Sequence, residues 1–147
     1  GQVTVAGLKS SLAALKDAVK AAGGRAVPLA VSGGFHSPFM EPAARQLEQV
    51  LSDMEIAAPR IPLYSNYTAK LYAGDYRMLL RQQVCHPVRW QAIVEDMIRQ
   101  GIDTFIEVGP GKTLCGLIAK IDPAVRVWNV ENAESLQAVI NEVKSEC

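Results

Sequence analysis

Segments typical of strands and segments typical of helices alternate along most of this 147-residue chain. The strand-like segments are short and apolar, and glycine or proline ends most of them. Between them, apolar residues recur at the three- and four-residue spacing of an amphipathic helix. Strands joined through helices are usually parallel, because each helix carries the chain back to the same end of the sheet. The alternation therefore predicts an α/β fold with a largely parallel sheet covered by helices.

The residues at the segment ends help to place each element. Asp75 can cap a helix, Pro42 fits the first turn of another, and Gly101 suits a helix end. We expect strands over residues 2–6, 25–31, 61–66, 104–108 and 125–128. We expect helices over residues 8–22, from Pro42 towards Ala57, from Asp75 to Val84, from Pro87 to Gly101, across Leu114–Ile121 and over residues 133–145.

The charge balance argues against one class of protein, although it leaves room for a local basic patch that binds one anionic partner. Fifteen basic and fifteen acidic residues give a formal net charge of zero, whereas a general nucleic-acid-binding protein needs a basic face.

No apolar run has the length of a membrane span, and Lys9, Lys16 and Lys20 interrupt the region where a signal peptide would lie. The sequence starts on a predicted strand without an initiator methionine, so we interpret it as a piece of a longer, cytoplasmic protein.

Cysteine and histidine are too few and too scattered for a disulfide framework or a metal centre. Cys85, Cys115 and Cys147 are odd in number and lack CxxC spacing, which favours reduced thiols. His36 and His86 are far apart and have no nearby cluster of carboxylates or cysteines. We therefore expect no metal site and no cofactor.

His36 is the most suggestive single residue. The predicted strand that ends at Val31 runs into Gly33 and Gly34, and the histidine follows directly after Phe35. Glycines permit close approach of a substrate, and active sites collect at the rims of α/β sheets, so the imidazole could act as a general base. The alternative is a histidine that fills or caps a turn, and composition alone favours this alternative.

The segment Gly109–Thr113 resembles a phosphate-binding loop at first sight. The Walker pattern needs a glycine at position 106, where this chain has Ile106. The alternative is that the glycines permit a tight strand-to-helix turn. An anion could still bind to the free N–H groups of the following helix.

The adjacent pair Cys85 and His86 could suggest a thiol nucleophile with its base. Neighbours in sequence point in different directions, and such pairs usually come from distant segments, so we favour packing at a helix end. The chain also has no Gly-x-Ser-x-Gly nucleophile elbow. A base at His36 would therefore lack its nucleophile within this sequence.

Four motifs occur in order along the chain, and together they are specific although each alone is weak. They are GQVTVAG at 1–7, FHSPFM at 35–40, PVRW at 87–90 and EVGPGK at 107–112. This ordered set resembles the malonyl-CoA:acyl-carrier-protein transacylases and the related acyltransferase domains of polyketide synthases. The resemblance runs over essentially the whole chain.

The resemblance implies the C-terminal portion of an α/β-hydrolase-like acyltransferase core, with part of an inserted ferredoxin-like subdomain. Residues 1–31 would form the closing β-α-β unit of the small subdomain, and residues 32–147 the C-terminal part of the large core. The serine elbow of the family, and the arginine that pairs with the malonyl carboxylate, would lie upstream of Gly1.

The reaction that the resemblance implies is malonyl transfer from coenzyme A to the phosphopantetheine thiol of acyl carrier protein in fatty acid biosynthesis, by Ser-His ping-pong catalysis. His36 matches the catalytic histidine, and Gln83 matches a position whose main-chain carbonyl orients the ring. Phe39 and Met40 would help to wall the acyl pocket. The partners would be malonyl-CoA, acyl carrier protein and the missing N-terminal half, and this piece alone would be inactive.

Three other functions stay open at this point. The chain could be a non-catalytic domain that binds acyl carrier protein or coenzyme A, or a piece of a polyketide synthase acyltransferase domain. A weaker alternative is a small phosphate-binding protein that uses residues 109–113. The resemblance implies that part of the pocket that would distinguish malonyl from methylmalonyl groups lies outside this sequence.

Overall fold

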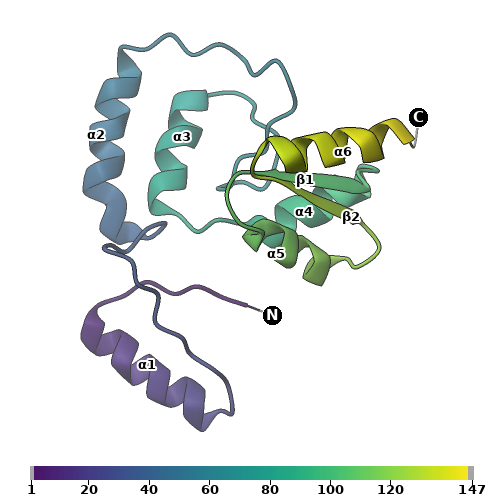
Figure 1. The fold of residues 1–147 in the computed structure, drawn as a ribbon. Coiled ribbons are helices and arrows are strands. Elements are labelled where there is room, and N and C mark those ends of the chain that lie inside the picture. Colours follow the sequence, from purple (N-terminus) through teal and green to yellow (C-terminus); the bar gives the residue numbers. More distant parts are fainter. Residues whose placement is uncertain (1, 146–147) are drawn as a thin grey trace. The chain divides into compact units, whose positions relative to one another are not determined.

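The computed structural model of the chain describes residues 2–145 and divides into two compact units, with the boundary between Val88 and Arg89. The elements of the first unit are α1 (Lys9–Ala21), the short 3-10 helix η1 (Pro38–Met40), α2 (Glu41–Ser52) and α3 (Tyr76–Cys85) (Figure 1). The elements of the second unit are α4 (Trp90–Arg99), β1 (Thr104–Val108), α5 (Thr113–Ile121), β2 (Arg126–Val130) and α6 (Ala133–Ser145).

In the first unit, helices α2 and α3 pack against each other, and η1 contacts both. Ala44 and Leu51 of α2 and Leu79 of α3 are buried in this contact. Arg77 adds a polar connection, because its side chain donates to the main-chain oxygens of Leu51, at 2.9 Å, and Met54. The guanidinium thus bonds one carbonyl in the last turn of α2 and one just beyond the end of the helix at Ser52. The predicted cap at Asp75 is confirmed, since its carboxylate accepts the Met78 N–H at 3.1 Å.

The strands predicted over residues 2–6 and 25–31 are wrong for this structure, although helix α1 between them is confirmed. Both segments lack regular secondary structure and belong to no sheet among the described residues, and the Val31 N–H donates to the Leu29 oxygen in a tight turn at 2.9 Å. A strand forms only where a neighbouring strand can take up its backbone hydrogen bonds. The alternating side chains Val27, Leu29 and Val31 are each about 60% exposed. The apolar pattern that predicts a strand is therefore present, but within the described part of the chain no other element packs over these side chains.

The strand predicted over residues 61–66 is reduced to one bridge. Tyr64 pairs with Leu71 in an antiparallel β-bridge, and the Tyr72 N–H donates to the Leu63 oxygen at 2.7 Å. The tight turn between them encloses Ser65, which is fully buried, and Ala69, which has a φ of 56°.

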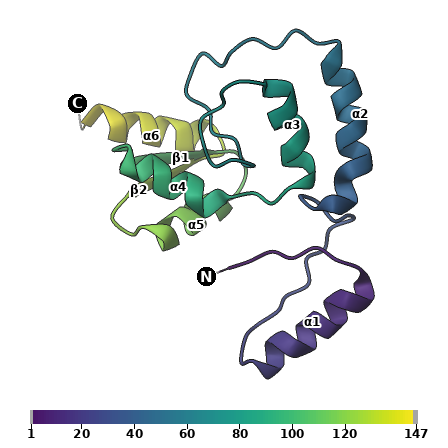
Figure 2. The same cartoon turned by 180° about the vertical axis from the view of Figure 1, so that it is seen from behind.

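The second unit is built on a two-stranded parallel sheet, as the alternation of strands and helices predicts. β1 and β2 run in register from Thr104 opposite Arg126 to Val108 opposite Val130. Helix α6 lies over one face of the sheet, and α4 and α5 lie over the other (Figures 1 and 2). Ile93, Val94, Ile118 and Val139 from these three helices form the buried core.

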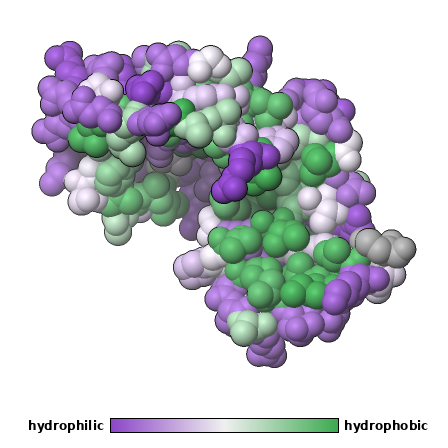
Figure 3. Space-filling model, turned by 90° about the horizontal axis from the view of Figure 1, so that it is seen from above, coloured by the Kyte–Doolittle hydropathy of each residue, from purple (hydrophilic) through white to green (hydrophobic). Residues whose placement is uncertain are grey.

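Many large apolar side chains stay on the surface, and Figure 3 shows them gathered into patches on one face. In the second unit, Ile106 and Val108 of β1 are 45% and 80% exposed. Within residues 2–145, none of the helices combines the length and the apolar character needed to cross a membrane.

Candidate active site

His36 occupies a constrained turn immediately before η1. Its φ of 56° lies in the left-handed region, which is uncommon for residues other than glycine. Ser37 is buried, and its hydroxyl donates to the Gly34 oxygen and accepts the Phe39 N–H at 3.3 Å. These contacts fix the backbone on both sides of the histidine. They also commit Ser37 to capping η1, so Ser37 is not the nucleophile of a dyad with its neighbour.

Gly34 is required by the close packing of this turn. A Cβ atom at this position would lie 3.1 Å from a ring carbon of Phe39 and 3.1 Å from the Ser37 hydroxyl. Real Cβ atoms seldom make contacts this short, so a larger residue would require Phe39 and Ser37 to shift by a few tenths of an ångström. At Gly33 the same atom would meet only the Phe35 ring, at an ordinary 3.7 Å.

The imidazole of His36 is oriented by the main chain of α3. Its Nδ1 lies 2.8 Å from the carbonyl oxygen of Gln83. A carbonyl can only accept, so Nδ1 carries a proton, and in the neutral ring the lone pair is then on Nε2. The residue is exposed, which leaves this second nitrogen available to a reactant. The ring is therefore held in the tautomer that a general base needs.

The Gln83 carbonyl is free for this contact because of the sequence that follows it. In a helix, this oxygen would accept the N–H of the residue four positions later, but that residue is Pro87, which has none. α3 ends at Cys85, and His86 before the proline is extended, with φ −121° and ψ 153°. The Pro-Val-Arg-Trp motif thus determines the helix end that presents the acceptor.

The side chain of Gln83 has its own partner. The Tyr72 hydroxyl donates to the Gln83 side-chain oxygen at 3.1 Å. Burial raises the pKa of Tyr72, partly offset by the Ser65 hydroxyl beside it, so the phenol is a protonated donor at neutral pH. Sequence analysis did not identify Tyr72 or Ser65, and no motif marks them.

The other two predicted site residues, Phe39 and Met40, lie in η1, which begins two residues after His36. The Phe39 side chain is 54% exposed and Met40 is half-buried. The structure therefore brings His36, Gln83, Phe39 and Met40 together within the first unit, on the ends of η1 and α3.

An ion-pair cluster on α2 and α3 lies next to this helix end. Arg81 contacts Glu41, and its Nε lies 3.3 Å from Glu48. A hydrogen bond from Arg45, with the nearby Cys85 thiol and Arg81, lowers the pKa of Glu41. This cluster joins the two helices whose ends carry the candidate site.

Cys85 and His86 do touch, contrary to the expectation that they point apart. The Cys85 Sγ lies 3.4 Å from the His86 Nδ1, but that nitrogen is closer to the Gln82 oxygen, at 2.8 Å. Nδ1 therefore donates to the carbonyl and cannot take a proton from sulfur. Burial raises the pKa of Cys85, and the His86 ring packs against Tyr67 at 4.7 Å. The two side chains pack at the end of α3, as the sequence predicts.

An acidic side chain accepts hydrogen bonds at the Gly109–Thr113 turn in the second unit. The carboxylate of Glu107 accepts the N–H groups of Leu114, at 3.2 Å, and Cys115, at 2.8 Å. The Cys115 N–H is the largest cause of a lowered pKa at Glu107. Glu107 already satisfies these N–H groups of the α5 N-terminus, so the expectation that a bound anion would meet free N–H groups there is wrong.

Asn129 binds the main-chain carbonyl groups of the same turn. The Asn129 amide donates to the oxygens of Gly111, at 2.7 Å, and Gly109, at 3.2 Å. Gly109 and Gly111 have φ values of 142° and 84°, which explains why glycine occupies both positions. The turn is a structural connection between β1 and α5.

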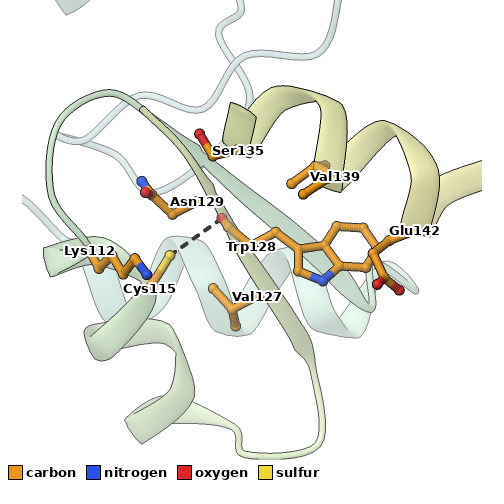
Figure 4. Close-up of a pocket in the computed structure, with 9 residues that line it drawn as sticks. Lys112, Cys115, Val127, Trp128, Asn129, Ser135, Val139 and Glu142 are labelled. Carbon is orange, nitrogen blue, oxygen red and sulfur yellow. Dashed lines mark hydrogen bonds between the residues drawn. The ribbon is translucent and has the colours of Figure 1, made fainter. Parts of the chain in front are cut away.

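A shallow hollow of about 360 Å3 lies along β2, between the start of α5 and helix α6 (Figure 4). Trp128 and Val139 supply apolar walls, Lys112 and Glu142 lie in its lining, and the Cys115 thiol donates to the Trp128 oxygen at 3.4 Å. None of His36, Gln83, Phe39 and Met40 lines it. Among residues 2–145, no cluster of histidine, cysteine and acidic side chains could hold a metal ion.

Comparison with known proteins identifies the class of fold. No family model matches the chain. A crystal structure of malonyl CoA-acyl carrier protein transacylase from Clostridium perfringens superposes with a TM-score of 0.89 at 37% identity, covering 92% of this chain and 44% of that one. A type II polyketide acyl carrier protein in complex with its malonyl-transacylase gives 0.87 at 36% identity, over 91% and 44%. The chain thus has part of an acyltransferase fold.

Sequence relatives specify the family. The malonyl CoA-acyl carrier protein transacylase of Bacillus subtilis is 35% identical over 99% of this chain, and that of Haemophilus influenzae is 38% identical over 95%. The chain spans about half the length of these relatives, 47% and 46%. Over that span it belongs to the malonyl CoA-acyl carrier protein transacylase family, as the ordered motifs predict.

Proposed function

We propose that this chain supplies the general base of an acyltransferase that moves a malonyl group from coenzyme A to acyl carrier protein. The observation that carries the proposal is the 2.8 Å contact between His36 Nδ1 and the Gln83 carbonyl, which favours the neutral tautomer with its lone pair on Nε2, on an exposed ring. The fixed turn around Gly34 and Ser37 keeps this nitrogen in one place.

In the first half-reaction, Nε2 of His36 takes the proton of a serine hydroxyl as the oxygen attacks the malonyl thioester carbonyl. The carbon–sulfur bond then breaks, and the imidazolium returns the proton to the departing coenzyme A thiolate. The products are a malonyl-serine ester and coenzyme A. The Gln83 carbonyl holds Nδ1–H throughout and, being neutral, stabilises the imidazolium less strongly than a carboxylate would.

In the second half-reaction, Nε2 takes the proton of the phosphopantetheine thiol as its sulfur attacks the ester. The serine oxygen leaves and receives that proton, so serine and histidine return to their starting states. This ping-pong order needs a single base that works in both directions. Phe39 and Met40 border the acyl group.

In this proposal the serine comes from a part of the full-length protein outside this chain, which spans about half the length of its relatives. We place this chain as the C-terminal portion of an α/β-hydrolase-like core, with residues 1–31 as part of an inserted ferredoxin-like subdomain. Two observations support the need for a covering partner: Val27, Leu29 and Val31 are exposed, and so are Ile106 and Val108 on β1. By itself the chain is inactive.

Malonyl-CoA and acyl carrier protein are the partners in this proposal, and the setting is cytoplasmic. The names of the relatives support both partners, and one solved neighbour is a complex with a polyketide carrier protein. Carrier proteins of fatty acid or polyketide synthesis are therefore the substrates to test.

The test is malonyl transfer from malonyl-CoA to phosphopantetheinylated acyl carrier protein, measured with the full-length protein that contains this segment. His36→Ala should lower the rate about 10²–10⁴-fold, the usual contribution of a positioned general base. His86→Ala is the matched control, because it removes the only other histidine of this segment from a packing role. Equal rates for the two variants would refute the proposed role of His36.

A further inference from the structure

Gln83 is held at two points, once through its main chain and once through its side chain. The carbonyl accepts His36 Nδ1 at 2.8 Å, and the side-chain oxygen accepts the Tyr72 hydroxyl at 3.1 Å. The two contacts belong to one residue in the last turn of α3. Any displacement of this residue therefore moves the acceptor on which the orientation of the His36 ring depends.

This peptide unit needs an anchor other than the helix. Pro87 cannot donate to the Gln83 carbonyl, and α3 stops two residues later at Cys85. Carbonyls in the last turn of a helix have no partner within it, and helix ends fray. The Gln83 side chain offers a further connection through which a neighbouring segment can hold the residue in place.

Tyr72 is well suited to provide that connection. Its backbone N–H bonds to Leu63, so the residue closes the antiparallel turn that surrounds the buried Ser65. Its ring stacks on Tyr76, the first residue of α3, with centroids 6.2 Å apart. The phenol is thus fixed both to the turn and to the helix, and its hydroxyl points at Gln83.

We propose that Tyr72 is a positioning residue for His36: its hydroxyl fixes Gln83, and the Gln83 carbonyl in turn fixes the Nδ1–H tautomer of the imidazole. The kinetic part of this inference rests on the proposed function, while the tautomer part concerns only the geometry of residues 36, 72 and 83. Tyr72 acts through Gln83 and need not touch the substrate.

The first experiment measures the imidazole 15N chemical shifts in the 147-residue chain, which contains two histidines. In the unmodified chain His36 should be largely protonated on Nδ1. Tyr72→Phe removes one hydroxyl and should shift His36 towards the Nε2–H form, which free imidazole side chains prefer. Tyr76→Phe is the matched control, because the same atom is removed from the ring that stacks on Tyr72. Equal tautomer populations in the two variants would overturn the proposal.

Gln83→Leu provides a second variant that keeps the carbonyl and removes only the acceptor of the Tyr72 hydroxyl. It should shift the His36 tautomer as Tyr72→Phe does, and the double variant should shift it no further, because both substitutions break the same contact. Additive shifts would mean that Tyr72 acts on His36 by another route, which contradicts the proposal. Melting curves of all variants identify any that fail to fold.

The kinetic experiment uses the full-length protein. Tyr72→Phe should lower kcat about 3- to 10-fold with little change in KM, the size expected for one neutral hydrogen bond that acts on the base and not on the substrate. Tyr76→Phe should leave both constants unchanged. If His36→Ala also retains full activity, the proposed function fails; if His36→Ala is inactive but the two tyrosine variants behave alike, only the role of Tyr72 fails.

Discussion

The Nδ1 atom of His36 and the main-chain oxygen of Gln83 lie 2.8 Å apart, although 47 residues separate them in the sequence. This contact connects the turn before η1 to the end of α3. A main-chain carbonyl is fixed by the fold and cannot be removed by a side-chain substitution. The orientation of the imidazole therefore depends on the turn around Gly34 and on the end of α3.

The tight turn predicts a difference between two neighbouring glycines. Gly34→Ala should destabilise the first unit by about 1–3 kcal/mol, the usual cost of forcing an extra carbon into a well-packed position. Gly33→Ala should change stability by less than about 0.5 kcal/mol, since its new Cβ makes only an ordinary contact. Urea unfolding of both variants measures the difference, and equal midpoints would show that the Phe39 contact is not restrictive.

Trp90 and Phe105 should be structural residues. Both are half-buried on apolar sides of α4 and β1, and truncation of a fully buried aromatic costs about 3–5 kcal/mol. Trp90→Ala should cost somewhat less than this range, because the side chain is partly exposed. A variant that kept its melting temperature would contradict the assignment.

The indole nitrogen of Trp90 allows a finer test. Nε1 is buried, and it has no hydrogen-bond partner within the described part of the chain. A buried donor without a partner carries a desolvation cost. Trp90→Phe should therefore retain much more stability than Trp90→Ala, as measured by thermal unfolding. Equal losses would indicate that Nε1 is bonded in solution.

Glu107 should make the second unit sensitive to acid. The N–H groups of Cys115 and Leu114 hold the pKa of its carboxylate below the ordinary value of 4.5. Because the folded-state pKa is the lower one, the stabilisation is complete above pH 4.5 and disappears as the pH falls through the folded-state pKa. Glu107→Gln should flatten this part of the stability profile. Glu134→Gln, which alters an exposed glutamate, should leave the profile unchanged.

Sequence patterns predicted the helices and the sheet of the second unit well, because apolar spacing and end residues act locally. Asp75, Gly101 and the α6 segment are where the sequence places them. The strands predicted over residues 2–6 and 25–31 failed, because a strand depends on a neighbouring strand that local sequence cannot supply.

The candidate site was predictable only in part. His36 and Gln83 came from a family resemblance, and Pro87 alone could have indicated a free carbonyl at Gln83. Tyr72 was not predictable, because its contact with Gln83 depends on how the turn around Ser65 folds back towards α3. Glu107 was missed because a strand residue that caps the following helix has no fixed spacing.

The isolated chain should show no malonyl transfer above the uncatalysed background. Acyl transfer through His36 needs a serine within hydrogen-bond reach, and the adjacent Ser37 is buried and bonded to Gly34 and Phe39. An assay with malonyl-CoA and acyl carrier protein measures this directly. Robust turnover by the pure 147-residue chain would contradict the account of the nucleophile.

The central claim is that His36 is a catalytic base and not a residue that merely completes its turn. The most direct test measures single-turnover acylation by malonyl-CoA and the melting temperature on the same full-length His36→Ala protein. A catalytic role predicts acylation slowed about 10²–10⁴-fold with a nearly unchanged melting temperature. A lowered melting temperature with normal acylation in the folded molecules would contradict the claim and make His36 a structural turn residue.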